Sequence, residues 1–341
     1  MSSIPKIIKN NQLKSYFLLT FLITWAIMFS PLIVPMNDPM ISILVMAIGG
    51  AGPAFAAIIL SAVLKPKKVE SQTLKRWAVF LIALIVTCIL IILYLQIDLA
   101  TIPIFLLLLI IINGAIAAYI ISGGLSSREG IKELLGRLYI WKVGLKWYLI
   151  ALLLVPAIYF LCIFFSSIDI GSSIFEILPQ VSFAPVSGII IAFGYVTLVR
   201  GPLREEIGWR GFALPRLQYI YSPLVGTLIL GVIWTVWHLP LHLNGTYSGG
   251  MDGFIDRFYF NIGITFIITW VYNHSKGSLL LTTLLHASFN VTDTIIIAPS
   301  VIAGPFLSIF IALINITAII VIIADKMWRK LPENHGAVYK Y

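Results

Sequence analysis

Long apolar runs follow one another along this chain, and they constrain its fold more than any other feature of the sequence. Ten such runs can be drawn, at residues 16–35, 40–64, 78–96, 101–122, 148–166, 184–200, 222–242, 256–273, 279–297 and 301–324. Each is close to the length of about 20 apolar residues with which an α-helix crosses a bilayer. Hydrophobic residues make up 60% of the chain and charged residues only 11%, and the mean hydropathy is +1.00. The sequence therefore predicts an all-α fold, a polytopic transmembrane helical bundle of about ten spans within a range of 8–10.

The basic residues, which give the chain a net charge of +9, gather in alternate loops between these runs. They are Lys6, Lys9, Lys14, Lys65, Lys67, Lys68, Lys75, Arg76, Arg128, Lys132, Arg137, Lys142, Lys146, Lys276, Lys326, Arg329 and Lys330. The other loops carry acidic residues instead, at Asp38, Asp98, Asp169 and Asp252. Because cytoplasmic loops of membrane proteins hold an excess of Lys and Arg, this pattern places both termini in the cytoplasm. We expect an integral protein of a bacterial cell membrane that contacts lipid, and no nucleic-acid partner.

The chain divides by composition into three parts. Residues 1–147 hold the first spans and a polar cytoplasmic segment, residues 148–325 form a transmembrane core, and residues 326–341 form a short cytoplasmic tail. Apolar residues recur at helical spacing between positions 131 and 138, which predicts a short amphipathic helix at the cytoplasmic interface. The first span has a basic start but no small-residue cleavage site, so we expect an uncleaved anchor.

Two adjacent glutamates, Glu205 and Glu206, follow the sixth apolar run and are expected at its cytoplasmic end. A charged side chain in a membrane span costs about 2.5–3.5 kcal/mol on insertion scales, so its presence needs a reason. Glu206 and Arg210 are four residues apart and share a helix face, which predicts an ion pair, whereas Glu205 points about 100° away. The alternative is that both glutamates only balance nearby arginines at the membrane surface.

Histidines mark the seventh and ninth runs. His238 lies one turn after Trp234, and Pro240 then ends or bends the helix, so His242 is expected on the loop side. His286 and Asn290 are four residues apart on one face, and Asp293 lies close to the same stripe. Each of these groups could also serve only to pack helices together through hydrogen bonds.

A carboxylate, two imidazoles and a carboxamide on three spans are together the groups needed to hydrolyse an amide. The carboxylate takes a proton from water, one imidazole orients that water or protonates the leaving amine, and the remaining groups donate hydrogen bonds to the developing oxyanion. Glu205, His238 and His286 could instead hold a zinc ion that activates the water. The spacing fits both mechanisms. Cys88 and Cys162 lie within apolar runs and indicate neither a disulfide nor a thiolate metal site.

Three ordered motifs carry a resemblance to a known family. They read Glu205-Glu-Ile-Gly-Trp-Arg-Gly-Phe-Ala-Leu-Pro215, Trp234-Thr-Val-Trp-His238 and His286-Ala-Ser-Phe-Asn290. In this order they resemble the motifs of the CAAX-protease and bacteriocin-processing (CPBP) family of intramembrane proteases, which includes the type II CAAX prenyl endopeptidases. The resemblance covers about residues 184–297.

The resemblance implies a role for each motif residue. Glu205 would activate the nucleophilic water with the help of His238, and Glu206 and Arg210 would support the site. His286 and Asn290 would stabilise the oxyanion. No cofactor is firmly implied, and between a zinc-dependent and a metal-independent glutamate mechanism we favour the second.

The predicted function is therefore that of an intramembrane endopeptidase acting on a membrane-associated or hydrophobic peptide or protein. The resemblance implies a cleavage site near the cytoplasmic membrane surface, with no prenyl group assumed. The alternatives are a non-catalytic membrane partner in bacteriocin self-immunity and a polytopic transporter. A transporter would show matching interrupted helices in its two halves, whereas the polar residues here all lie in the second half.

Overall fold

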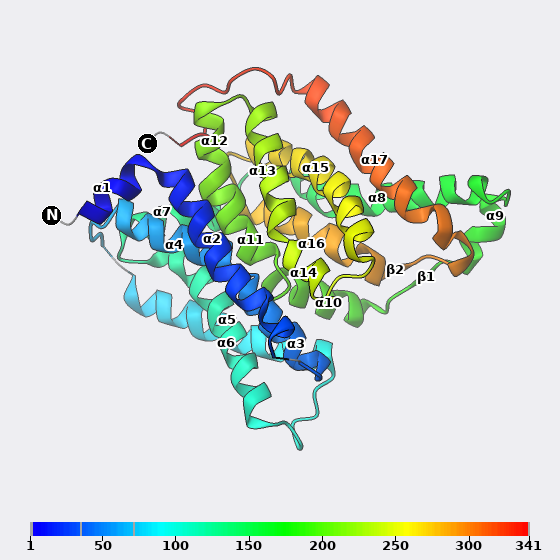
Figure 1. The fold of residues 1–341 in the computed structure, drawn as a ribbon, viewed down its shortest axis with the longest axis horizontal. Coiled ribbons are helices and arrows are strands. Elements are labelled where there is room, and N and C mark those ends of the chain that lie inside the picture. Colours follow the sequence, from blue (N-terminus) through cyan, green and yellow to red (C-terminus); the bar gives the residue numbers. More distant parts are fainter. Residues whose placement is uncertain (1–2, 35, 71, 340–341) are drawn as a thin grey trace.

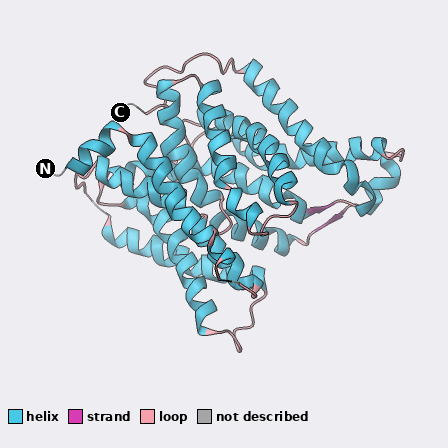
Figure 2. Ribbon diagram, in the orientation of Figure 1, coloured by secondary structure: helices cyan, strands magenta, loops and turns pink. Residues whose placement is uncertain are grey.

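The computed structural model describes residues 3–34, 36–70 and 72–339, and it forms the predicted all-α bundle (Figures 1 and 2). The helices are α1 Ser3–Asn10, α2 Gln12–Met28, α3 Pro39–Gly49, α4 Gly52–Leu64, α5 Thr73–Leu95, α6 Ile104–Ser122, α7 Glu129–Gly136, α8 Leu145–Asp169, α9 Ile174–Ile177, α10 Val186–Leu198, α11 Pro202–Gly208, α12 Leu214–Ile220, α13 Pro223–Trp237, α14 Leu239–Leu243, α15 Gly250–His274, α16 Leu279–Ile295 and α17 Ala303–Ala324. The strands β1 Ser182–Phe183 and β2 Ile296–Ile297 form one short antiparallel pair.

Nine helical stretches within the described ranges are long and apolar enough to cross a membrane. They are Gln12–Leu32, Pro39–Leu64, Thr73–Leu95, Ile104–Leu125, Leu145–Asp169, Val186–Ile220, Pro223–Leu243, Gly250–His274 and Ser300–Ala324. The predicted run 279–297 becomes α16, which is 17 residues long and packs between α8, α10 and α15. It is mostly buried among other helices, so Thr282, Thr283, His286, Ser288 and Thr292 face protein rather than lipid.

The sixth span is much longer than the predicted run 184–200, because the helical path continues from Val186 to Ile220. It breaks once, where Gly201 adopts a φ of 130° and Pro202 then begins α11. A π-helical turn at Trp209–Ala213 leads into α12. The expectation that the glutamates lie at the cytoplasmic end of this span is therefore wrong: they lie in its middle, inside the protein.

Arg204 fixes α11 against the first half of the bundle. Its guanidinium is fully buried and donates to the backbone carbonyl of Ala47 at 2.6 Å and to the side-chain oxygen of Asn113 at 2.8 Å. It also donates to the carbonyls of Asn113 and Leu198, at 3.1 and 3.3 Å. These acceptors lie on α3, α6 and α10, so one side chain ties three helices to the segment that carries the glutamates.

The two ends of the described chain lie at the same end of the bundle (Figure 1). Helix α1 packs on α4, and the Tyr339 backbone N–H donates to the Pro215 carbonyl at the foot of α12. The Leu224 N–H at the start of α13 donates to the carbonyl of Met327, just beyond α17. The strand pair β1/β2 lies at the far end.

Replacing Arg204 with methionine is expected to destabilise the bundle. The substitution leaves several buried acceptors without donors, and each such group costs roughly 1–3 kcal/mol. Thermal unfolding of the detergent-purified protein measures the loss. The control is Arg329→Met, which removes an exposed arginine of the tail. Equal unfolding temperatures for the two variants would contradict the anchoring role of Arg204.

Candidate active site

A cavity of about 630 Å³ lies between α10, α11, α13, α15, α16 and α17. Glu205, His238, His286 and Asn290 all line it, so four of the predicted site residues from three motifs share one space. Glu206 and Arg210, the other two, are fully buried behind the cavity wall. The fold thus brings together the residues that the motifs singled out.

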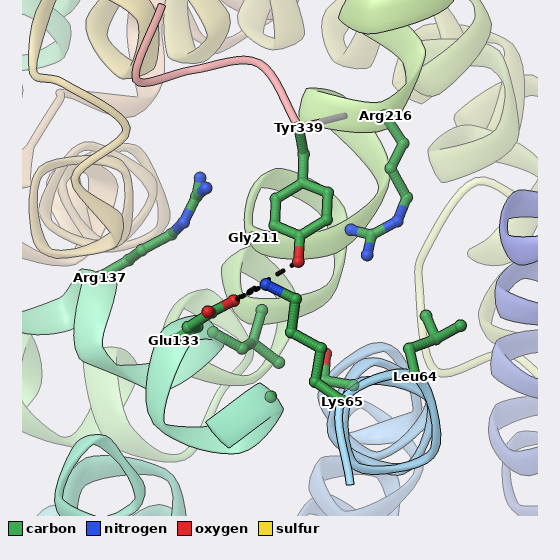
Figure 3. A pocket seen from close by; sticks show the side chains of 10 residues that line it. Leu64, Lys65, Glu133, Arg137, Gly211, Arg216 and Tyr339 are labelled. Atoms are coloured by element: carbon green, nitrogen blue, oxygen red, sulfur yellow. Dashed lines mark hydrogen bonds and ion pairs between the residues drawn. The ribbon is translucent and has the colours of Figure 1, made fainter. Parts of the chain in front are cut away.

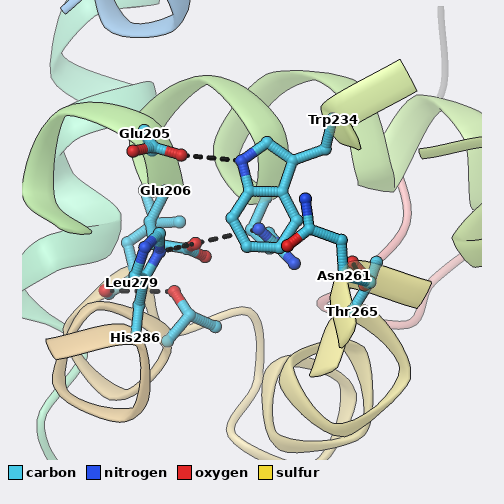
Figure 4. Close-up of polar contacts among 9 residues, drawn as sticks. Glu205, Glu206, Trp234, Asn261, Thr265, Leu279 and His286 are labelled. Carbon is cyan, nitrogen blue, oxygen red and sulfur yellow. Dashed lines mark hydrogen bonds and ion pairs between the residues drawn. The ribbon is translucent and has the colours of Figure 1, made fainter. Parts of the chain in front are cut away.

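The Glu205 carboxylate contacts Gly201 at the start of α11 and the indole of Trp234. The Trp234 Nε1–H donates to Glu205 Oε2 at 2.7 Å (Figure 4). The other oxygen, Oε1, lies against Gly201, where a Cβ atom would come within 2.4 Å of it. Gly201 is therefore required twice, for its positive φ and for the space it leaves to the carboxylate. Within the described residues we find no donor to Oε1, which remains available to a water molecule.

Glu206 forms the centre of a buried ion cluster. Its Oε1 accepts from Arg210 Nη1 at 2.9 Å and from His286 Nδ1 at 2.8 Å (Figure 4). The predicted ion pair between Glu206 and Arg210 is confirmed. The surface alternative is wrong, because both side chains are fully buried and Arg204 bonds to carbonyls and an amide instead. The Arg210 guanidinium also lies over the Trp234 ring, 4.9 Å from its centroid, which links the two carboxylate environments.

His238 is oriented by the last turn of α13. Its Nδ1 lies 2.7 Å from the Trp234 carbonyl oxygen, an atom that only accepts, so Nδ1 carries the proton. The ring packs edge-on against Trp237, with centroids 4.7 Å apart. His286 Nδ1 is fixed in the same way by the Glu206 carboxylate. Among the residues that the structure describes, each imidazole therefore keeps Nε2 as the nitrogen without a protein partner.

Trp234 is the site residue that sequence reasoning undervalued. It was recognised as the neighbour of His238 on one helix face, but its indole is also the direct partner of Glu205. Its position one turn before His238 indicates that it faces the site. Its bond to Glu205 could not be predicted from α13 alone, because Glu205 lies on another helix.

The cavity wall also includes residues to which the sequence assigned no role in the site. His242 lies on α14 and is buried, not on the loop side, because Pro240 bends the chain into another helical turn instead of ending it. Arg257 stacks on Tyr247, 4.3 Å from its ring centroid, and both line the cavity. Asp293 lines it too, at the end of the stripe that His286 begins.

The zinc alternative requires three ligands around one point. Among the described residues, no three His, Cys, Asp or Glu side chains are grouped in this way. The side chains as arranged do not fit a zinc ion, and no step below is derived through one.

Comparison with known proteins points to the same region. Residues 187–292 match the family model described as "Type II CAAX prenyl endopeptidase Rce1-like". The chain is also similar to a curated protein, CAAX prenyl protease 2 of Methanococcus maripaludis, with 29% identity over 204 residues that cover 55% of this chain and 73% of the relative. The family match runs from α10 into α16 and contains all three motifs. The resemblance read from the motifs is confirmed.

Replacing Glu206 with glutamine is expected to destabilise the protein strongly. It leaves the fully buried Arg210 without a counter-charge, and breaking a buried ion pair from one side costs about 3–5 kcal/mol. The double variant with Arg210→Met should lose less than the sum of the two single variants, because the two side chains form one unit. Unfolding of all three variants in detergent measures this, and strictly additive losses would argue against the pair.

Proposed function

We propose that this chain, a member of the CPBP family to which the type II CAAX prenyl endopeptidases belong, hydrolyses peptide bonds with a water molecule activated by Glu205. The family supports an intramembrane endopeptidase. One observation carries the finer proposal: Glu205 lines a cavity with one oxygen fixed by Trp234 and the other without a protein donor. That arrangement suits a general base, because the carboxylate is positioned yet retains an acceptor for a water proton.

Attack begins with water between Glu205 and His238. Glu205 Oε1 accepts one water proton while the water oxygen forms a bond to the peptide carbonyl carbon. His238, whose Nδ1–H is engaged by the Trp234 carbonyl, offers Nε2 as an acceptor for the second water proton and so orients the nucleophile. The π electrons of the carbonyl move onto its oxygen, which becomes an oxyanion.

Asn290 and His286 are the donors for that oxyanion. Both line the cavity on α16, one turn apart, so both can point to one substrate oxygen. Asn290 donates from its amide, and a protonated His286 donates from Nε2. When the tetrahedral intermediate collapses, the C–N bond breaks and the proton held by Glu205 passes to the leaving amine. The products are a carboxylic acid and an amine, and Glu205 is a carboxylate again.

The buried Glu206 and Arg210 side chains allow a carboxylate at Glu205 and a protonated His286 to lie side by side. Glu205 and Glu206 bring two negative charges, and Arg210 brings one positive charge. A proton on His286 makes the set neutral, and Glu206 stabilises that proton through the bond to Nδ1. Glu206 and Arg210 therefore act through His286 as positioning residues and touch no substrate in this proposal.

The substrate is proposed to be a membrane-associated or hydrophobic peptide or protein. The cavity joins the polar groups of the site to an apolar wall that includes Phe260, Phe289 and Phe310. The name of the similar archaeal protein refers to prenyl substrates. Nothing in this wall distinguishes a prenyl chain from an apolar side chain, so the proposal requires no prenyl group.

Glu205→Gln is expected to abolish cleavage while the protein stays folded and inserted. Loss of a general base lowers the rate by about 10²–10⁴-fold. The measurement compares membrane peptides from cells that carry the wild-type protein or the variant, and looks for peptides whose cleavage needs Glu205. Glu133→Gln, a half-exposed carboxylate far from the cavity, is the matched control. If Glu205→Gln and His286→Ala both leave the cellular function unchanged, the catalytic proposal fails and a binding role takes its place.

Chelation is expected to leave the cleavage rate unchanged, because Glu205 rather than a metal activates the water in this proposal. The purified protein is treated with 1,10-phenanthroline, assayed on a peptide identified by the preceding comparison, and analysed for bound metal. Loss of activity that zinc restores, together with stoichiometric zinc in the untreated protein, would replace the glutamate mechanism with the metal-dependent one.

A further inference from the structure

The cavity opens toward one particular end of the bundle. Helices α13 and α16 contribute their C-terminal turns, through His238 and Asp293. Helices α15 and α17 contribute their N-terminal turns, through Arg257 and Leu307. Since these two pairs of helices run in opposite directions, all four supply the same end of the bundle. The loop 244–249, between α14 and α15, lies at that end and also lines the cavity, through Thr246, Tyr247 and Ser248.

The basic loops lie at the opposite end. Helix α13 starts there, beside Met327, and α15 ends there, where His274 bonds to Asp325 at 2.6 Å. A smaller cavity of about 260 Å³ marks this end (Figure 3). It is lined by Lys65, Arg137 and Arg216 among others, and Lys65 pairs with Glu133 at 2.6 Å.

The charges of the two ends differ in sign. The basic residues between α4 and α5, between α6 and α8 and after α17 all belong to the end that carries the termini. The acidic residues Asp38, Asp98, Asp169, Glu176 and Asp252 lie at the other end, in the loops or on the helix turns beside them. Two arginines, Arg200 and Arg257, lie among the residues that line the catalytic cavity there, together with the acids Asp256 and Asp293. An excess of Lys and Arg marks the cytoplasmic side of a membrane protein.

We infer that the catalytic cavity receives its substrate from the non-cytoplasmic side of the membrane, so the substrate is an exported or membrane-anchored peptide exposed on that side. The inference rests on the proposed function and replaces the cytoplasmic cleavage site that the family resemblance implied. It follows from two independent facts: the end at which the helices leave the cavity open, and the end at which the basic loops gather.

The cavity has the dimensions and lining for a short peptide segment. Its volume falls in the range of about 300–1,000 Å³ that is typical of small-ligand sites, so it holds a few residues and not a folded domain. The apolar wall of Phe260 and Phe310 stacks beside the polar site, with ring centroids 5.9 Å apart. Asp256 and Arg257, of opposite sign, line the same space, which favours no strong net charge on the peptide.

Cysteine labelling in intact cells tests the direction of access. The background variant carries Cys88→Ala and Cys162→Ala, which remove both native thiols. A single cysteine is then placed at Thr246, which is exposed at the cavity mouth, or at Lys67, which is exposed in the basic loop after α4. A membrane-impermeant, charged maleimide is the probe, applied before and after permeabilisation. Ser248→Cys and Lys142→Cys form a second exposed pair, in case one of the first variants does not fold.

We expect Thr246→Cys to label fully in intact cells, with no gain on permeabilisation, and Lys67→Cys to label only after permeabilisation. The reverse pattern, or labelling of both positions in intact cells, would overturn the inference. Labelling needs no hydrolysis, so Glu205→Gln should give the same pattern. If labelling is as expected but no peptide depends on Glu205, the proposed function fails while the direction of the opening stands.

Discussion

The neutralisation of buried charge governs this structure. Glu206 and Arg210 lie where neither lipid nor water can solvate them, and one oxygen of the Glu206 carboxylate receives both Arg210 and the cavity-lining His286. Two of the three are on the helix segment 202–213 and the third is on α16, so the pairing also holds those segments in register. A site that must carry charge inside an apolar bundle needs such a cluster, since an isolated ion would cost several kcal/mol.

Beside this cluster, the helix break before α11 places the two adjacent glutamates in different surroundings. Gly201 follows the end of α10, and Pro202 begins α11. On this helix neighbouring side chains point about 100° apart, so Glu205 contacts Trp234 while Glu206 pairs with Arg210. Arg204, on the same short helix, donates hydrogen bonds to α3, α6 and α10 and so fixes the position of α11 relative to these helices. The first half of the bundle thus contributes to the site, both through these bonds and through Met28, Met46 and Ala47, which line a smaller cavity together with Glu205 and His238.

The orientation of the whole molecule then bears on the substrate. The cavity and the basic loops lie at opposite ends of the bundle, so the side from which a peptide can enter is tied to the side on which those loops lie. Similarity to a family supports a reaction class, but it does not define the side from which a peptide enters. That side depends on the loop charges of this chain and on the end of the bundle at which its helices leave the cavity open.

The sequence by itself determined the class of fold, because runs of about 20 apolar residues permit little besides membrane helices. It also determined that Glu206 pairs with Arg210, since four-residue spacing on a helix is a local rule. It failed where contacts between helices decide the outcome: the sixth span extends to Ile220, and the glutamates lie inside it. The pairing of Glu205 with Trp234 and of Glu206 with His286, and the end at which the cavity opens, were decided only by tertiary structure, because they depend on how helices distant in sequence pack side by side.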